Sequence, residues 1–209
     1  MIKARPLAAL AVLSLGIYPA LAQSPAANMS FFVTSSNPGK GGDLGGLAGA
    51  DAYCQSLAAA VGAGGKTWHA YLSTSSVNAK DRIGNGPWYN FAGVKIADDL
   101  AELHSDHNNL TAETALNEQG KTPNYIGGAQ PLQHDMLTGT NEDGTASGMT
   151  CNNWTDGSDD ATATLGHADR MGRNPGLNSW ISVHPSQGCS LEKLAPTGGA
   201  GLFYCFAVN

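Results

Sequence analysis

Hydrophobic and polar positions change their period along the chain, and each period predicts a different element. Residues 29–35 (MSFFVTS) are rich in β-branched and aromatic side chains, which predicts a strand. Apolar positions then recur at three- and four-residue spacing, which predicts a helix whose buried stripe contains Leu47, Ala50, Cys54, Leu57 and Val61. Gly62 suits the C-terminal cap of this helix. Because Cys54 lies on the stripe, its thiol is expected to face the core.

The segment 66–75 alternates with period two. Trp68, Ala70 and Leu72 point one way, and His69, Tyr71 and Ser73 point the other way, which predicts a half-buried strand. Residues 149–155, 178–184 and 201–208 are predicted to be further short strands between glycine-rich loops.

Residues 77–150 show no strong periodicity and are predicted to be mostly irregular, with short helical turns at 97–104 and 111–117. So long an irregular stretch is uncommon in a compact domain unless the loops are functional or cross-linked.

The first 22 residues have the pattern of a secretory signal peptide. Lys3 and Arg5 precede an apolar stretch from residue 6 to 17, and the small-residue motif Ala20-Leu21-Ala22 predicts cleavage after Ala22. The apolar stretch is short for a membrane span, which disfavours the alternative of an uncleaved anchor, and no later segment qualifies as a span. We expect one domain over residues 23–209, in a secreted or periplasmic protein.

Removal of this segment leaves nine basic residues against 17 acidic ones, a formal charge of −8. A chain this acidic, without a Lys/Arg cluster, is a poor partner for nucleic acid, heparin-like polyanions or anionic membranes. The 27 glycines and the scarcity of charge favour a loop-rich exported protein.

Four cysteines follow the signal peptide, at positions 54, 151, 189 and 205. An even number after a signal peptide predicts two disulfides, and spacing alone leaves all three pairings open. Zinc–thiolate binding is the alternative, but the sequence has no Cys-x-x-Cys and no close Cys/His pair.

Motifs of catalysis are absent: there is no Gly-x-Ser-x-Gly, no His-Glu-x-x-His and no phosphate-binding glycine loop. We therefore expect a protein that is not an enzyme and assign no catalytic residue. His104 and His107, with Asp106 between them, could form a metal site if His134 and Asp135 added ligands. The alternative is a polar surface loop, so we assign no metal ligand.

Two acidic loops are better candidates for ligand contact. One offers Asn141, Glu142 and Asp143, and the other offers Asp156, Asp159 and Asp160. Carboxylates with Asn and Gly suit calcium, which is therefore the candidate cofactor, although the same residues also form solvated turns. Asp135 is a further candidate for ligand contact.

Aromatic side chains offer a second mode of contact, by stacking on sugar faces. Trp88 and Tyr89 lie in a Gly/Pro turn, GNGPWYNFAG, and are our candidates for exposed aromatics; the alternative is a buried loop anchor.

Four fragments together resemble endostatin, the C-terminal domain of certain collagens. GGLAGADAYCQSLAAAVGAGGKTWHAYLST is similar to its G-I-R-G-A-D-x-x-C … G-T-F-R-A-F-L-S-S stretch, and HDMLTGTNEDG to its H-G-S-D-P-N-G turn. TCNNWT is similar to C-E-T-W-R, and GCSLEKLAPTGGAGLFYCFAVN to the closing segment Y-I-V-L-C-I-E-N. The resemblance spans residues 29–209, is patchy between 77 and 130, and keeps all four cysteines in order. It extends to a group of exported bacterial lectin-like proteins.

The resemblance implies an α+β fold, a variant of the C-type lectin-like fold with a long irregular loop region. It also implies two nested disulfides, Cys54–Cys205 and Cys151–Cys189. The calcium-bridged sugar motifs of C-type lectins are not carried over, because Gln130-Pro131 is followed by Leu132 and Trp180 by Ile181. Endostatin's arginine patch and N-terminal zinc ligands are missing as well, and a shared fold does not transfer function.

These patterns together predict an exported, non-enzymatic, lectin-like module. Its expected partner is a glycan or another extracellular polymer, bound around residues 85–160. A protein-binding adhesin or structural envelope component on the same fold is the alternative. A metal-dependent hydrolase built on His104, His107 and His134 is the third reading.

Overall fold

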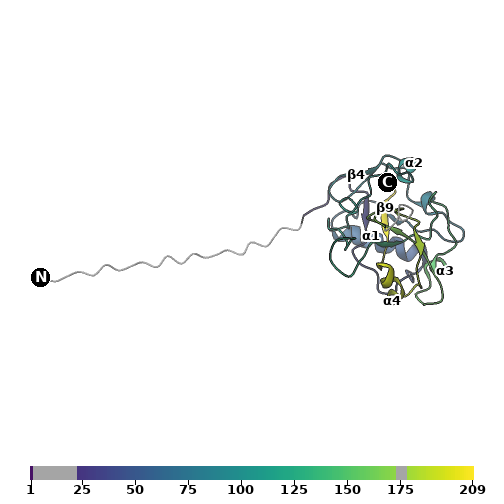
Figure 1. Ribbon diagram of the computed structural model, residues 1–209. Coiled ribbons are helices and arrows are strands. Elements are labelled where there is room, and N and C mark those ends of the chain that lie inside the picture. Colours follow the sequence, from purple (N-terminus) through teal and green to yellow (C-terminus); the bar gives the residue numbers. More distant parts are fainter. Residues whose placement is uncertain (2–22, 173–177) are drawn as a thin grey trace.

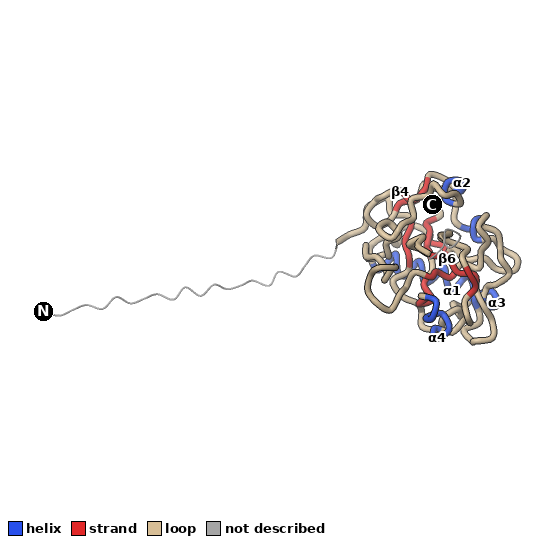
Figure 2. Tube along the Cα trace, viewed as in Figure 1, coloured by secondary structure: helices blue, strands red, loops and turns tan. Residues whose placement is uncertain are grey.

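The computed structural model describes residue 1, residues 23–172 and residues 178–209 (Figure 1). All but the first residue of the predicted signal peptide lies outside the described residues. Figure 2 shows short strands near the centre of the molecule, helices around them, and loops along much of the chain. The predicted α+β class is confirmed: the described part combines few helices with several small sheets and two disulfides.

A three-stranded sheet in the order β1-β9-β2 lies at the centre. It consists of β1 (Phe31–Val33), β2 (Trp68–Ala70) and β9 (Tyr204–Ala207), and both outer strands pair antiparallel with β9. Side chains of β9 alternate between two hydrophobic clusters, with Cys205 and Ala207 in one and Tyr204 and Phe206 in the other. Because both faces of the sheet are covered, the last strand is a continuous apolar run.

The helix α1 (Gly46–Ala60) covers one face of this sheet, as the spacing predicts. Its fully buried positions are Ala50, Cys54 and Ala58, whose small side chains allow close approach to β2. The helix ends at Ala60, Val61 is its C-cap, and Gly62 follows with a φ of 88°, the left-handed conformation that glycine adopts after a helix end.

The two disulfides have the pairing that the resemblance implies. Cys54 on α1 is bonded to Cys205 on β9. The predicted inward direction of the Cys54 side chain is therefore confirmed. Cys151 is bonded to Cys189, and this second bridge lies within the sequence span of the first. The bridges therefore connect the first helix to the last strand and tie two loops of the second half together.

A second sheet has the order β7-β6-β5-β8. Its strands are β5 (Asp135–Leu137), β6 (Thr164–His167), β7 (His184–Pro185) and β8 (Gly199–Leu202). Four small elements lie between β2 and β5 in the sequence: η1 (Ala79–Arg82), β3 (Trp88–Tyr89), β4 (Lys95–Ala97) and α2 (Leu100–Leu103). The short helix α4 (Leu191–Leu194) and the turn η3 (Ala195–Thr197) precede β8.

Several expectations are wrong in detail. The strand predicted over 66–75 ends at Ala70, and Tyr71, expected on the exposed side, is fully buried. Residues 201–208 form parts of two strands, β8 and β9, in different sheets rather than one strand. Residues 178–184 are extended only at His184, and residues 111–117 form a turn rather than a helix.

The strand predicted over 149–155 is replaced by a tight turn, α3 (Cys151–Trp154). All four of its residues have positive φ, between 47° and 67°, so the backbone is left-handed. Asn152 and Asn153 tolerate this conformation better than most residues because their side chains bond locally. The turn is held by the Thr150 hydroxyl, which accepts the Asn153 N–H, and by the indole of Trp154, which donates to the Ser73 carbonyl at 2.7 Å.

Candidate functional site

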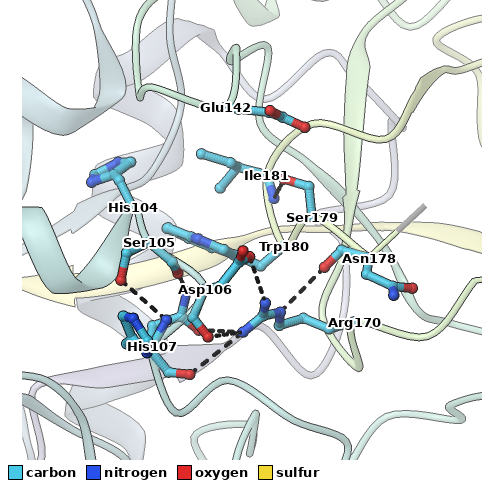
Figure 3. Close-up of a pocket in the computed structure, with 11 residues that line it drawn as sticks. His104, Ser105, Asp106, His107, Glu142, Arg170, Asn178, Ser179, Trp180 and Ile181 are labelled. Atoms are coloured by element: carbon cyan, nitrogen blue, oxygen red, sulfur yellow. Dashed lines mark hydrogen bonds and ion pairs between the residues drawn. The ribbon is translucent and has the colours of Figure 1, made fainter. Parts of the chain in front are cut away.

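A polar cavity of about 510 Å³ opens on the surface between the long irregular region and the segment that precedes β7 (Figure 3). Cavities of this size accommodate small ligands. Its walls are formed by side chains of both charges over an aromatic floor; the lining residues are His104, Ser105, Asp106, His107, Asn108, Glu142, Arg170, Asn178, Ser179, Trp180 and Ile181.

Arg170 forms one wall, and its guanidinium is fixed by neighbours on three sides. Nη2 donates to the Asp106 carboxylate at 3.2 Å, and Nη1 donates to the Asn108 side-chain oxygen at 3.3 Å. Nε donates to the Asn178 carbonyl at 3.2 Å. Because these contacts hold the planar group in one orientation, its positive charge is positioned before any ligand arrives.

Buried aromatic groups form the floor. The Trp180 indole donates to the Leu103 carbonyl at 3.0 Å, and its ring lies 4.8 Å from the ring of Tyr71. Both ring nitrogens of His104 form hydrogen bonds in this floor. Nδ1 lies 2.8 Å from the Leu100 carbonyl, which can only accept, so Nδ1 carries the proton and Nε2 accepts from the Tyr71 hydroxyl at 2.6 Å.

Burial lowers the pKa of His104, and the positive charge of Lys80 adds to this effect, against the opposing influence of the Leu100 carbonyl and Asp143. The folded protein therefore prefers the neutral imidazole. Above a pH of about 6.5 the group is neutral in both states and contributes no pH dependence. As the pH falls below that value, the unfolded chain takes up the proton first, so the free energy of unfolding decreases until the folded pKa is passed.

We expect His104→Gln to flatten this part of the stability profile. Glutamine keeps one donor and one acceptor for Leu100 and Tyr71 but does not titrate. Urea unfolding at a series of pH values between 7 and 5 measures the slope in both proteins. An unchanged slope in the variant would show that His104 is not the group that titrates.

Glu142 forms the opposite rim, on a turn that closes with the pairing of Thr140 and Ala146 (Figure 3). The neighbouring Asp143 accepts from the backbone and hydroxyl of Thr145, and these hydrogen bonds lower its pKa. Gly144 has a φ of 82°, and an added Cβ would lie 2.6 Å from His104 Nε2. Only glycine therefore lets this turn pack against the floor of the cavity.

Of the ligand candidates from the sequence, Glu142 lines the cavity, and Asn141 and Asp143 are exposed on the same turn. The expectation for Trp88 is wrong: the side chain is 1% exposed and packs edge-on against Phe206, so it is the buried anchor and cannot stack on a ligand. Tyr89 is half-buried on β3.

Asp156 is half-buried in the second acidic loop, where its carboxylate accepts the Ser158 N–H at 2.8 Å. Within the described ranges, no three carboxylates of the two acidic loops converge on one point. Calcium binding by these loops stays a prediction.

The histidines do not form the trio considered from the sequence. His107 is exposed at the cavity and His104 uses both nitrogens in the floor. His134 lies instead with His167 and Asp169, and Asp135 lies with His167 and His184. Neither His104 nor His107 belongs to these groups.

The sequence reasoning missed Arg170 and Trp180 in the cavity, and His167, His184 and Asp169 beside Asp135. The separations in sequence are large: Arg170 contacts Asp106 from 64 residues away, and Trp180 contacts Leu103 from 77 residues away. No local pattern marks such pairs, so only paired positions across many related sequences would have revealed them.

No protein-family model and no curated protein sequence matches this chain. In the part of the chain that the structure describes, no helix has the length and apolar character needed to cross a membrane.

Proposed function

We propose that the protein is an exported, non-enzymatic binding module that recognises carbohydrate in the cavity between Arg170 and Glu142. The observation that carries the proposal is the composition of this cavity. Hydrogen-bonding groups of both charges, with Arg170 held in place, surround an opening above an aromatic floor, and the long irregular segment supplies much of the wall.

Sugars present several hydroxyl groups, each able to donate and accept a hydrogen bond. The exposed carboxylates of Asp106 and Glu142 are acceptors, and Arg170 and Asn178 provide donors. Hydrogen bonds with charged partners contribute more than neutral ones. Because Arg170 is already held in place, its contacts cost little ordering of the protein on binding.

The fold we propose for this module is the endostatin-like variant of the C-type lectin-like fold. The nested pairing of the four cysteines and the placement of the last strand beside the first helix support this proposal. Two disulfides are typical of proteins from oxidising compartments, which supports a secreted or periplasmic location.

The first test is a glycan array probed with the processed, oxidised chain, run with calcium and again with chelator. A glycan that binds is then titrated against two variants with exposed changes in the cavity, Glu142→Gln and His107→Ala. Loss of one hydrogen bond to the ligand should weaken binding about tenfold in each variant. Glu192→Gln, an exposed change outside the cavity, is the matched control and should bind as the parent does.

Glycan binding that both cavity variants leave unchanged would place recognition elsewhere on the surface. Binding that is lost in chelator would add calcium at the acidic loops. No glycan binding by a chain with a cooperative unfolding transition would contradict the proposal and favour the alternative, a protein-binding adhesin or envelope component.

A further inference from the structure

A second cavity, of about 610 Å³, is lined by other residues than the proposed carbohydrate site and has a different character. Its mouth is formed largely by apolar side chains: Ile126, Pro131, Leu132, Met171 and Pro196. Three imidazoles line its wall, those of His134, His167 and His184. The carboxylate of Asp135 is 1% exposed and lies against them.

The second sheet brings these side chains together. Asp135 on β5 and His167 on β6 are direct partners in the antiparallel register, so they share a face of the sheet. His184 on β7 is the partner of Leu165, which is two residues from His167 and therefore on the same face. Three strands thus place one carboxylate and two imidazoles on one side.

The carboxylate of Asp135 lacks a hydrogen-bond donor among the described residues. Neither of its oxygens receives a hydrogen bond in the described part of the chain, although both are inaccessible to solvent. Burial of an ionised carboxylate without compensation is costly. Three ring nitrogens lie close to Oδ1: the Nε2 atoms of His167, His134 and His184, at 3.2, 3.3 and 3.8 Å.

In His134 and His184, the partner of Nδ1 determines whether Nε2 carries a proton or a lone pair. His134 Nδ1 lies 3.3 Å from the carboxylate of Asp169, and His184 Nδ1 lies 3.1 Å from the Pro185 carbonyl. Both partners are acceptors, so a neutral ring carries its proton on Nδ1 and presents the Nε2 lone pair toward Asp135, whereas a protonated His134 donates to Asp169 and Asp135 together. A proton on one of these rings, or a metal cation that the rings and the carboxylate share, would compensate the charge of Asp135.

Two of the three separations are close to those of one shared ion, and the third, 3.8 Å between Asp135 Oδ1 and His184 Nε2, is longer. Zinc binds imidazole nitrogen and carboxylate oxygen at about 2.0–2.2 Å in a tetrahedron, so neighbouring ligand atoms lie about 3.3–3.5 Å apart. His167 Nε2 lies 3.2 Å from both Asp135 Oδ1 and His184 Nε2. The Asp169–His134 contact is the arrangement in which a carboxylate orients a metal-binding histidine through its outer nitrogen.

We propose that Asp135, His167 and His184 bind a divalent transition metal of the zinc type, with His134 as the adjacent fourth group. The imidazoles border the cavity, so an ion bound here is reachable from solvent. This site is independent of the proposed carbohydrate site, since the two cavities share no lining residue.

The test is metal binding by the processed chain after treatment with chelator. Calorimetric titration with Zn²⁺ should give one ion per chain, saturating zinc should raise the melting temperature, and Co²⁺ should give the visible absorption of a tetrahedral site. Asp135→Asn and His184→Ala should each weaken zinc binding at least 100-fold and abolish the thermal shift. His69→Gln, a histidine outside the cluster, is the control and should bind zinc as the parent does.

The metal-free proteins separate a binding defect from a folding defect. Asn at position 135 keeps the shape of the side chain and removes an uncompensated charge, so metal-free Asp135→Asn should unfold at or above the temperature of the metal-free parent. Absence of saturable zinc binding by the parent would overturn the proposal. Zinc affinity that both cluster variants retain, or that His69→Gln loses equally, would also overturn it.

Discussion

Removal of the outer disulfide by the double substitution Cys54→Ala/Cys205→Ala is expected to lower the free energy of unfolding by about 5 kcal/mol. The bridge joins residues 151 positions apart, so it restricts a large part of the unfolded chain. Both cysteines are fully buried in the cluster between α1 and β9. A loss of this size is comparable to the whole stability of many domains.

Thermal and urea unfolding of the purified variant measure this effect. The expected decrease in melting temperature is roughly 10–20 °C for a domain of this size. The matched control, Cys151→Ala/Cys189→Ala, opens a loop of only 38 positions and should cost about 4 kcal/mol. The urea dependence of unfolding should also steepen in the outer variant, because its unfolded chain expands further. An equal melting temperature in parent and outer variant would contradict the argument.

Arg82→Met is expected to have the second largest effect, a loss of about 3 kcal/mol. The guanidinium bonds to Asp51 of α1 at 2.6 Å and also donates to the Ala70 carbonyl of β2. The other oxygen of Asp51 accepts the Ala70 N–H at 2.8 Å. The side chains are only 10% and 24% exposed, so removal of the cation leaves a partly buried carboxylate and a carbonyl without their partner.

A second substitution distinguishes the charge from the packing. In Arg82→Met/Asp51→Asn the amide oxygen still accepts from Ala70 but carries no charge, so part of the lost stability should return. The exposed ion pair of Lys95 and Asp98 is the control, and Lys95→Met should leave the urea midpoint unchanged. Equal midpoints for Arg82→Met and Lys95→Met would show that the Arg82 pair acts as an ordinary surface pair.

Long-range contacts within the fold explain both effects. The described sheets are small, with strands of two to four residues, and much of the chain is loop. Strands this short are marginal on their own. The disulfides and the Arg82–Asp51 pair connect elements that are far apart in sequence. Their loss should therefore lower the stability of the whole domain rather than of one segment.

The sequence by itself determined the features that depend on neighbouring residues. The helical period of residues 47–61 is a local property, and it placed Cys54 on the buried side of α1 correctly. The apolar character of residues 29–35 and 201–208 predicted strands near the places where β1 and β9 occur. The even number of cysteines predicted two bridges, and the resemblance to endostatin implied their pairing.

Only the tertiary structure decided the remaining elements. β5 and β6 are only three and four residues long, too short for a periodic signal in the sequence. They are strands because they pair with each other and with neighbouring strands. The left-handed turn at residues 151–154 follows from the local hydrogen bonds and the Cys151 bridge, which override the strand-like composition. Trp88 is buried because β9 packs against it, which its Gly/Pro surroundings do not reveal.

For the same reason, neither cavity could be predicted from the sequence. Asp106 and Glu142 were visible as polar loop residues, but the Arg170 that fixes one wall comes from a distant segment. Asp135 and His167 are 32 positions apart and become neighbours only through the antiparallel register of β5 and β6. Strand register is set by long-range pairing, which a pattern of neighbouring residues does not encode, so the sequence indicated which groups were available and the tertiary structure decided which of them meet.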